Sequence, residues 1–159
     1  MKSNKSKLSI NSDSGFTIVE IIVITLIIGV LLTILLLTYS GIQVRQRNTA
    51  RITDIKLIQA NLETFYAQSG FYPTLAELND SSWTTSNLKQ VEPTQLHDPS
   101  AKSNTPRFSD TPKPDEFSYQ PTSSSGTPCD DKTVACGKYV LTATLEGNAG
   151  TFVEDSLNQ

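Results

Sequence analysis

The most prominent feature of the hydropathy pattern is a long apolar run near the start of the chain. Residues 21–44, which are 24 in number (44 − 21 + 1), include no Asp, Glu, Lys or Arg. About 20 helical residues cover the hydrocarbon core of a bilayer, so the run has the length of a membrane-spanning helix. A removable secretory signal is the alternative, but the run is long for one, and the only cleavage position near Ser40 is poor. The pattern therefore predicts an anchored chain.

Hydrophobic residues continue at helical spacing beyond this run. They step by three, three, four and three positions, which places them on one stripe of an amphipathic helix: Ile52, Ile55, Ile58, Leu62 and Phe65. Gly70 suits the position just after a helix, and Pro73 prevents its continuation. We predict one helix over residues 16–69, ~80 Å long at the standard rise. Its second half needs a sheet to cover the apolar stripe.

Alternating apolar and polar residues in the last third of the chain predict strands. Residues 138–146 alternate, with Tyr139, Leu141, Ala143 and Leu145 on one face, and a turn over 147–150 leads to a predicted return strand over 151–154. Residues 116–120 form a third, short strand. The predicted fold class is α+β, with a long N-terminal helix packed on a small C-terminal antiparallel sheet.

The segments between these elements have loop compositions. Residues 106–114 and 121–128 are rich in Pro, Ser and Thr and are predicted to be loops. Residues 74–79 are expected to form a helical turn, and Trp83 is expected to anchor the core of the head.

Composition and charge exclude several classes of function. Lys and Arg number 13 against 16 Asp and Glu, so the basic surplus needed to bind nucleic-acid phosphates is missing. Two Cys and one His are too few for a metal-ligand cage. The head outside the long helix has room for only a modest core. We therefore expect no enzyme, no cofactor, no metal and no nucleic-acid partner.

Glu20 lies between Val19 and Ile21, where an ionised carboxylate is costly and usually has a partner or a function. One interpretation is a side chain that reaches the membrane boundary. The other requires a cation at the same depth. Cleavage after Gly15 would supply that cation, because the new amino terminus on Phe16 lies about one helical turn from Glu20.

Charge does not settle the orientation of the span, since Lys residues precede it and Arg residues follow it.

The motif Gly15-Phe16-Thr17-Ile18-Val19-Glu20, with a basic leader before it and a long apolar helix after it, resembles the class III signal of type IV prepilins. Gly29 matches the mid-helix glycine of that family, and the resemblance continues to Pro73. In the family, a membrane-embedded prepilin peptidase cuts after the Gly and methylates the new N-terminal Phe. The Glu then pairs with the N-terminal amine of a neighbouring subunit during assembly.

The resemblance implies that Gly15 is the cleavage residue, Phe16 the methylated terminus and Glu20 the assembly carboxylate. The chain would comprise a leader over 1–15, an assembly helix over 16–44, an amphipathic continuation over 45–69 and an extracytoplasmic head over 70–159. The implied partners are other copies of the chain in a homopolymer, the peptidase, an assembly platform and, before assembly, membrane lipid. The implied location is the cytoplasmic membrane as a single-pass protein, and then a cell-surface filament.

Two features depart from the family pattern. Many members carry a helix-kinking proline where this chain has Leu37, and the fifteen-residue leader is longer than the shortest ones. A pseudopilin of a type II secretion or DNA-uptake system shares the same helix and remains an alternative to a pilin. A monomeric membrane-anchored binding domain and an anchored enzyme are alternatives of other classes.

Small residues recur at intervals of four within the span, at Thr25, Gly29 and Thr33. Such spacing lets another helix backbone approach closely, although Gly and Thr are also common in membrane helices in general. In an exported head, Cys129 and Cys136 are expected to form a disulfide, with two free thiols as the alternative.

Acidic residues occur in several predicted loops of the head. Asp130 and Asp131 have no spacing that resembles a dedicated calcium loop, so solvated surface charge is the preferred interpretation. His97 and Asp98 have no nucleophile signature around them and are interpreted as loop surface.

Overall fold

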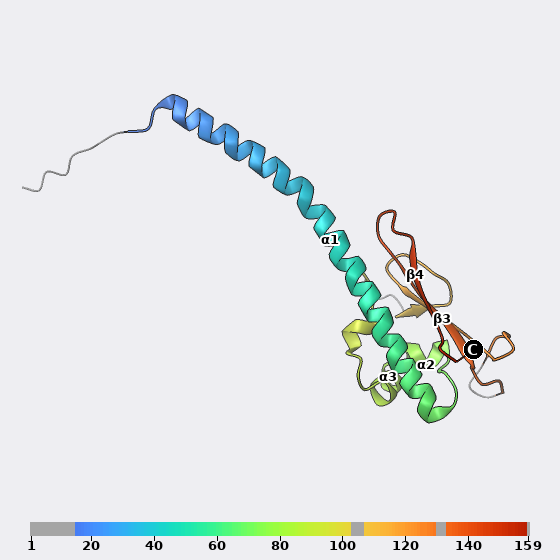
Figure 1. Cartoon of the computed structure of the whole chain (residues 1–159). Coiled ribbons are helices and arrows are strands. Elements are labelled where there is room, and N and C mark those ends of the chain that lie inside the picture. The colour runs from blue at the N-terminus through green and yellow to red at the C-terminus, as the bar shows by residue number, and fades with distance from the viewer. Residues whose placement is uncertain (1–14, 103–106, 130–132, 159) are drawn as a thin grey trace, which may run out of the picture. The chain divides into compact units, whose positions relative to one another are not determined.

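The computed structural model describes residues 15–102, 107–129 and 133–158. The chain divides into two compact units, Met1–Ser40 and Gly41–Gln159. Helix α1, Ile18–Ser69, contributes to both (Figure 1). The predicted leader lies outside the described residues except for Gly15.

In the first unit, residues 15–17 are not helical, and α1 begins at Ile18, two residues later than predicted. Each large apolar side chain from Ile18 to Leu36 is between 40% and 80% exposed. Among the described residues, α1 is a helix that is both long enough and apolar enough to cross a membrane. Its most apolar window has a mean hydropathy of 3.1. A helix that is apolar on all sides is normally buried in protein or in lipid.

The second unit contains a four-stranded sheet with the order β1-β2-β3-β4. The strands are β1 Phe108–Ser109, β2 Phe117–Thr122, β3 Lys138–Thr144 and β4 Thr151–Asp155. Three short helical segments precede them: α2 Leu75–Asn79, α3 Ser81–Asn87 and a 3-10 helix, Pro93–Leu96. The long apolar helix and the small sheet give the α+β layout.

The sheet is mixed, so the prediction of a wholly antiparallel sheet was wrong. Strands β2, β3 and β4 pair antiparallel, whereas β1 pairs parallel with β2. Strand β1 falls within the predicted loop 106–114, and its two residues are too few to show a strand period. Strand β2 also continues into the second predicted loop, where Pro121 pairs with Tyr139. Pro121 is tolerated because β1 is too short to reach it, so no ladder partner is lost on that side.

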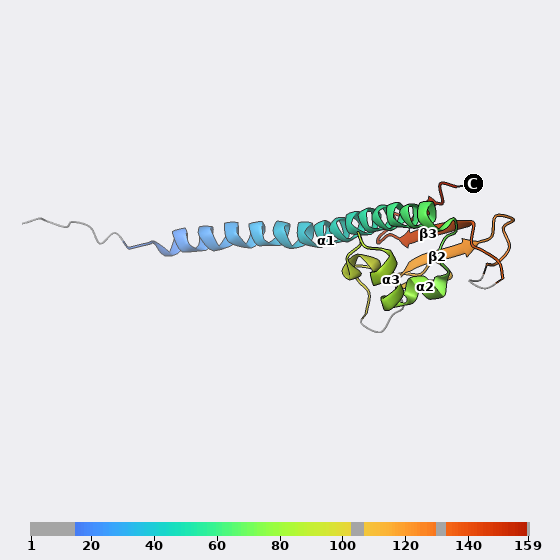
Figure 2. The same cartoon turned by 90° about the horizontal axis from the view of Figure 1, so that it is seen from below.

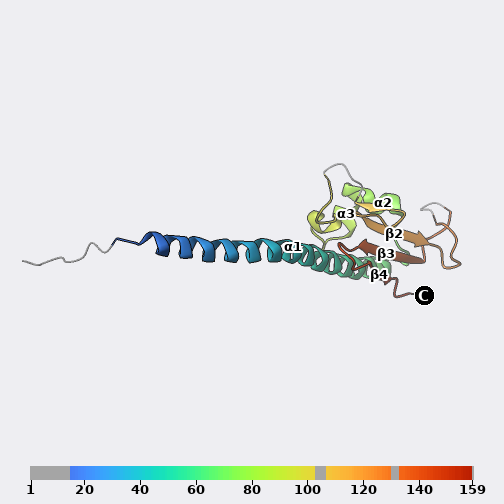
Figure 3. The ribbon, with the colours of Figure 1, turned by 90° about the horizontal axis from the view of Figure 1, so that it is seen from above.

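The apolar stripe of α1 covers the sheet, as the sequence predicted. Ile55, Ile58 and Leu62 are fully buried, and they join one core with the inward-facing side chains of β2 and β3: Phe117, Tyr119, Tyr139, Leu141 and Ala143. Figures 2 and 3 show β3 and β4 beside the later turns of α1, with α2 and α3 on the side of β2. Trp83 of α3 packs against this core, 5.1 Å from the ring of Phe65.

Helix α1 ends where its sequence requires. The backbone amide of Gly70 donates to the carbonyl of Tyr66 at 2.7 Å, and Gly70 has a φ of 78°, a conformation that favours glycine. Thr74 then caps α2 and shares reciprocal hydrogen bonds with Glu77. The predicted turn over 74–79 is confirmed as this short helix.

Candidate functional site

The predicted cleavage point lies in the extended segment just before α1. The backbone amide of Glu20 donates to the Thr17 hydroxyl at 3.2 Å, so Thr17 caps the helix. The Gly15–Phe16 peptide bond therefore precedes the helix instead of lying inside it. Phe16 is 73% exposed, and a Cβ added at Gly15 would meet no atom within 4 Å. The local structure leaves this bond accessible to a peptidase.

Glu20 occupies the first turn of α1 and is exposed. A carboxylate there interacts favourably with the positive end of the helix dipole. Within the described part of the chain, no cation lies within ion-pair distance of its carboxylate. Any partner that neutralises Glu20 in apolar surroundings has to come from outside this set of residues.

The small residues of α1 share a feature that suits helix packing. The Thr25 hydroxyl donates to the carbonyl of Ile22 at 2.9 Å, and the Thr33 hydroxyl donates to the carbonyl of Gly29 at 2.9 Å. Both hydroxyls are therefore bonded to their own helix. A Cβ at Gly29 would meet no atom within 4 Å. This face of the helix is shallow and open to the approach of another backbone.

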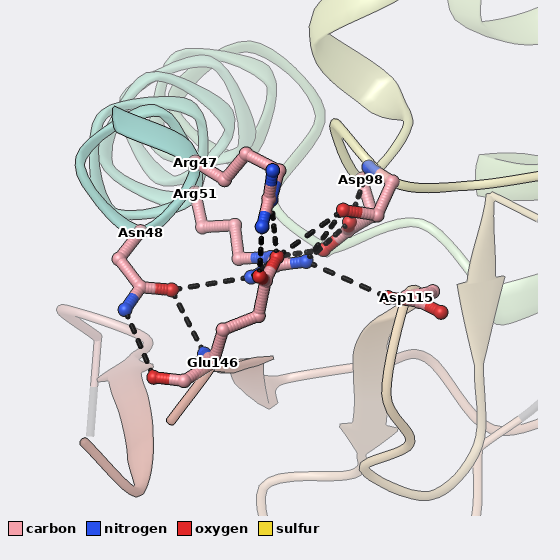
Figure 4. Close-up of polar contacts among 7 residues, drawn as sticks. Arg47, Asn48, Arg51, Asp98, Asp115 and Glu146 are labelled. Atoms are coloured by element: carbon pink, nitrogen blue, oxygen red, sulfur yellow. Dashed lines mark hydrogen bonds and ion pairs between the residues drawn. The ribbon is translucent and has the colours of Figure 1, made fainter. Parts of the chain in front are cut away.

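The most strongly constrained polar group of the second unit is Arg51 of α1 (Figure 4). Its guanidinium forms a two-pronged ion pair with Asp98, with Nε to Oδ2 at 2.6 Å and Nη2 to Oδ1 at 2.8 Å. Both side chains are 0% exposed. The prediction that His97 and Asp98 form loop surface was wrong, because Asp98 faces this buried cation. The His97 ring accepts a hydrogen bond from Arg107 at 3.2 Å and is half-buried.

Glu146, in the turn after β3, joins the same network. Its carboxylate accepts two hydrogen bonds from Arg47 and lies 2.8 Å from Nη1 of Arg51. The hydrogen bonds from Arg47, and after them the hydrogen bond and positive charge of Arg51, lower the pKa of Glu146 to about 2. The Asn48 side chain also pairs with the backbone of Glu146, accepting from its amide at 2.8 Å and donating to its carbonyl at 3.1 Å. The network fastens the loop after β3 and the loop at Asp98 onto α1.

A further acidic group and a hydroxyl also contact Arg51. Asp115 lies 3.6 Å from its Nη2, and the Ser100 hydroxyl accepts from the same nitrogen at 3.1 Å. Burial, with Asp98 as a second cause, raises the pKa of Asp54 to about 6. The network pairs the two arginines with the carboxylates of Asp98 and Glu146, as in a structural ion-pair cluster.

A second polar cluster fixes the C-terminal end of the described chain. The carboxylate of Glu63 on α1 accepts hydrogen bonds from the hydroxyls of Tyr72 at 2.8 Å and Tyr139 at 2.9 Å. It also accepts from the backbone amide of Leu157 and the side-chain amide of Asn158, both at 3.1 Å. Burial is the main cause that raises the pKa of Tyr72 to about 12 and that of Tyr139 further. The cluster holds the residues after β4 against α1.

Cys129 and Cys136 form a disulfide in the structure. Cys136 is buried, and its carbonyl accepts a hydrogen bond from the amide of Tyr72 at 2.8 Å. The bond therefore closes a loop next to the core, just before β3.

Asp130 and Asp131 lie outside the described residues. Within the described ones, no three His, Cys, Asp or Glu side chains form a metal-ligand group.

Replacing both cysteines with Ser is expected to destabilise the second unit by about 2–3 kcal/mol, because the bond closes a short loop and restricts the unfolded chain. Insertion of the apolar helix should be unchanged, since the pair is far from it in the sequence. Thiol labelling of the unreduced protein tests the bond directly. Two fully reactive thiols in the native protein would contradict it.

Comparison with protein-family models, with curated proteins and with solved structures returned no match to this chain. Sequence reasoning missed the network around Arg51. The one signal available for it was the presence of three Arg residues, Arg45, Arg47 and Arg51, on a helix otherwise expected to pack against a sheet.

Proposed function

We propose that the chain is the structural subunit of a type IV pilus-like filament, processed by a prepilin peptidase and polymerised through α1. The observation that carries the proposal is the start of α1. An accessible Gly15–Phe16 bond precedes a helix whose large apolar side chains from Ile18 to Leu36 are exposed. The first turn of this helix carries a carboxylate that has no ion-pair partner among the described residues. A bilayer would cover those side chains before assembly, and sister helices would cover them afterwards.

The two halves of α1 have different tasks in this proposal. The first half enters the membrane as a single span and then the filament core, with Thr25, Gly29 and Thr33 on one packing face. The second half is covered by the sheet and belongs to an extracytoplasmic head. The head is fastened to the helix by polar contacts and a disulfide, and its role is structural rather than enzymatic.

Processing is the test. In the mature protein isolated from cells, we expect the loss of residues 1–15 and an N-methylated Phe16 at the amino terminus. N-terminal mass spectrometry measures both. A chain that retains residues 1–15, or that starts after Ser40, would contradict the proposal and favour a monomeric anchored domain or a removed signal.

Variants of Gly15 sharpen this test. If the peptidase pocket admits no side chain, Gly15→Ala should be cut in part and Gly15→Val hardly at all. Gly41→Ala is the matched control, because a Cβ at Gly41 would also meet no atom within 4 Å. Its processing should equal that of the unmodified chain.

A further inference from the structure

A polar groove lies in the second unit between the last turns of α1 and the chain that follows α3. Its volume is about 390 Å³, and its lining includes Asn61, Phe65 and Gln68 from α1 and Asn87, Lys89 and Gln90 from the segment at and after the end of α3. This volume falls within the range of ~300–1,000 Å³ for small-molecule sites. The groove has no part in the processing or the assembly proposed above.

The groove presents neutral hydrogen-bonding groups. Asn61 and Asn87 line the groove, and each donates a side-chain N–H to a carbonyl of its own helix at 2.9 Å, so that its side-chain oxygen is still an available acceptor. Gln68 and Gln90 are exposed, and their side chains have no hydrogen bond to any residue that the structure describes. Together these carboxamides offer both donors and acceptors without a net charge.

One wall of the groove is aromatic. Phe65 lines it, and its ring is fixed edge-on by Trp83 at 5.1 Å and by Phe71 at 5.8 Å. A rigid ring face with a negative quadrupole attracts polarised C–H groups. The wall therefore suits a ligand that has an apolar C–H face as well as polar edges.

The charges around the groove favour a neutral ligand. The groove lies at the C-terminal ends of both α1 and α3, where the negative ends of the helix dipoles disfavour anions and oppose the attraction that Lys89 exerts on them. Neither helix has a basic residue in its last turn. Lys89 opposes cations, and a wholly apolar ligand would leave the carboxamides without partners. Hydroxyl groups both donate and accept hydrogen bonds, so they match the carboxamides of the groove.

From this arrangement we infer that the groove binds a neutral, hydroxyl-rich ligand, a saccharide of one or two units. The sugar hydroxyls exchange hydrogen bonds with Gln68, Gln90 and the side-chain oxygens of Asn61 and Asn87. The C–H face of the ring rests on Phe65. The chain would thus carry a carbohydrate site on its head, whether or not the chain forms filaments.

Saturation-transfer NMR tests this inference on the full chain in a detergent without a sugar head group. The probes are the methyl glycosides of glucose, galactose and N-acetylglucosamine, with galacturonate and inorganic phosphate as anionic comparisons. We expect transfer to at least one neutral glycoside with a millimolar dissociation constant, and weaker transfer to galacturonate. No transfer to any of the three glycosides would overturn the inference, as would tighter binding of galacturonate or phosphate.

A double variant locates the binding. Gln68→Ala with Gln90→Ala removes two exposed carboxamides. The double variant should raise the dissociation constant of the glycoside about tenfold, because two neutral hydrogen bonds are lost. Gln46→Ala, an exposed carboxamide several turns earlier on α1, is the matched control and should bind as the unmodified chain does. Equal affinity in the double variant would place the binding elsewhere and overturn the assignment. Processing at Gly15 should be normal in all three proteins, so failure here is distinguishable from failure of the proposed filament function.

Discussion

Arg51→Ala is expected to lower the free energy of unfolding of the second unit by about 3–5 kcal/mol. This loss is a large part of the stability of a domain of this size. The guanidinium and the carboxylate of Asp98 are both completely buried, with two hydrogen bonds of 2.6 and 2.8 Å between them. Truncation of Arg51 leaves Asp98 charged and without its partner in a place that water does not reach. Glu146 loses one contact but keeps Arg47.

Trp83, the single tryptophan of the chain, provides the measurement. Its ring packs on Phe65 next to the core, so its fluorescence during urea unfolding reports on the second unit and not on the apolar helix. Arg45→Ala is the matched control, because Arg45 is exposed and forms no ion pair with any described residue; it should change stability by less than about 0.5 kcal/mol. A loss below about 1 kcal/mol in Arg51→Ala would mean that Asp98 finds another partner or that water enters.

The double variant Arg51→Met with Asp98→Leu separates the cost of an orphaned charge from the value of the pair. Replacement of both partners by apolar side chains of similar size leaves no buried charge. We expect this variant to recover most of the stability lost in Arg51→Ala. If it is as unstable as Arg51→Ala, then the hydrogen bonds of the pair contribute more than the burial of its charges costs.

The sequence predicted the elements whose residues repeat with a period. The buried stripe Ile55, Ile58 and Leu62 follows from steps of three and four. Strand β3 follows from the recurrence of apolar side chains at every second position, which are buried in the structure. Gly70 marks the end of α1 because its positive φ is a backbone conformation that glycine adopts more readily than other residues. In each case the information lies within one turn or one strand of the chain, where local geometry decides the structure.

The sequence could not predict the elements that depend on distant partners. Strand β1 is two residues long and exists only because β2 lies beside it. Helix α3 has a sequence of weak helix formers with one large apolar residue, Trp83, and Asp80 caps it through the amides of Ser82 and Trp83.

Asp98 shows the same limit at the candidate site. A lone aspartate in a loop is normally solvated, and nothing near it in the sequence indicates a partner. Its partner Arg51 is 47 positions away. The pair becomes evident only when the fold brings the loop onto α1, so the local sequence could not indicate this buried ion pair.

The carboxylate of Glu20 raises the converse problem, because it has no partner among the described residues. In the proposed filament the helices of neighbouring subunits would enclose it. The positive amino terminus of Phe16 in an adjacent subunit would then be the cation placed to neutralise it. Removal of one member of such a pair leaves the other charge buried, at a cost of about 3–5 kcal/mol. In the membrane, by contrast, water and lipid head groups are within reach of the first turn of the helix.

Glu20→Ala is therefore expected to be inserted and largely cleaved but to assemble poorly. Glu20→Asp, one methylene shorter, should be intermediate, and mixed filaments with unmodified subunits should form because the defect is local to one contact. Blots of sheared surface fractions and of membrane fractions, probed for the head, measure the distribution. Asp155→Ala, an exposed carboxylate at the end of β4, is the control and should assemble normally. A normal filament yield from Glu20→Ala would show that the carboxylate is incidental, and the proposal of a monomeric membrane-anchored domain would then take precedence.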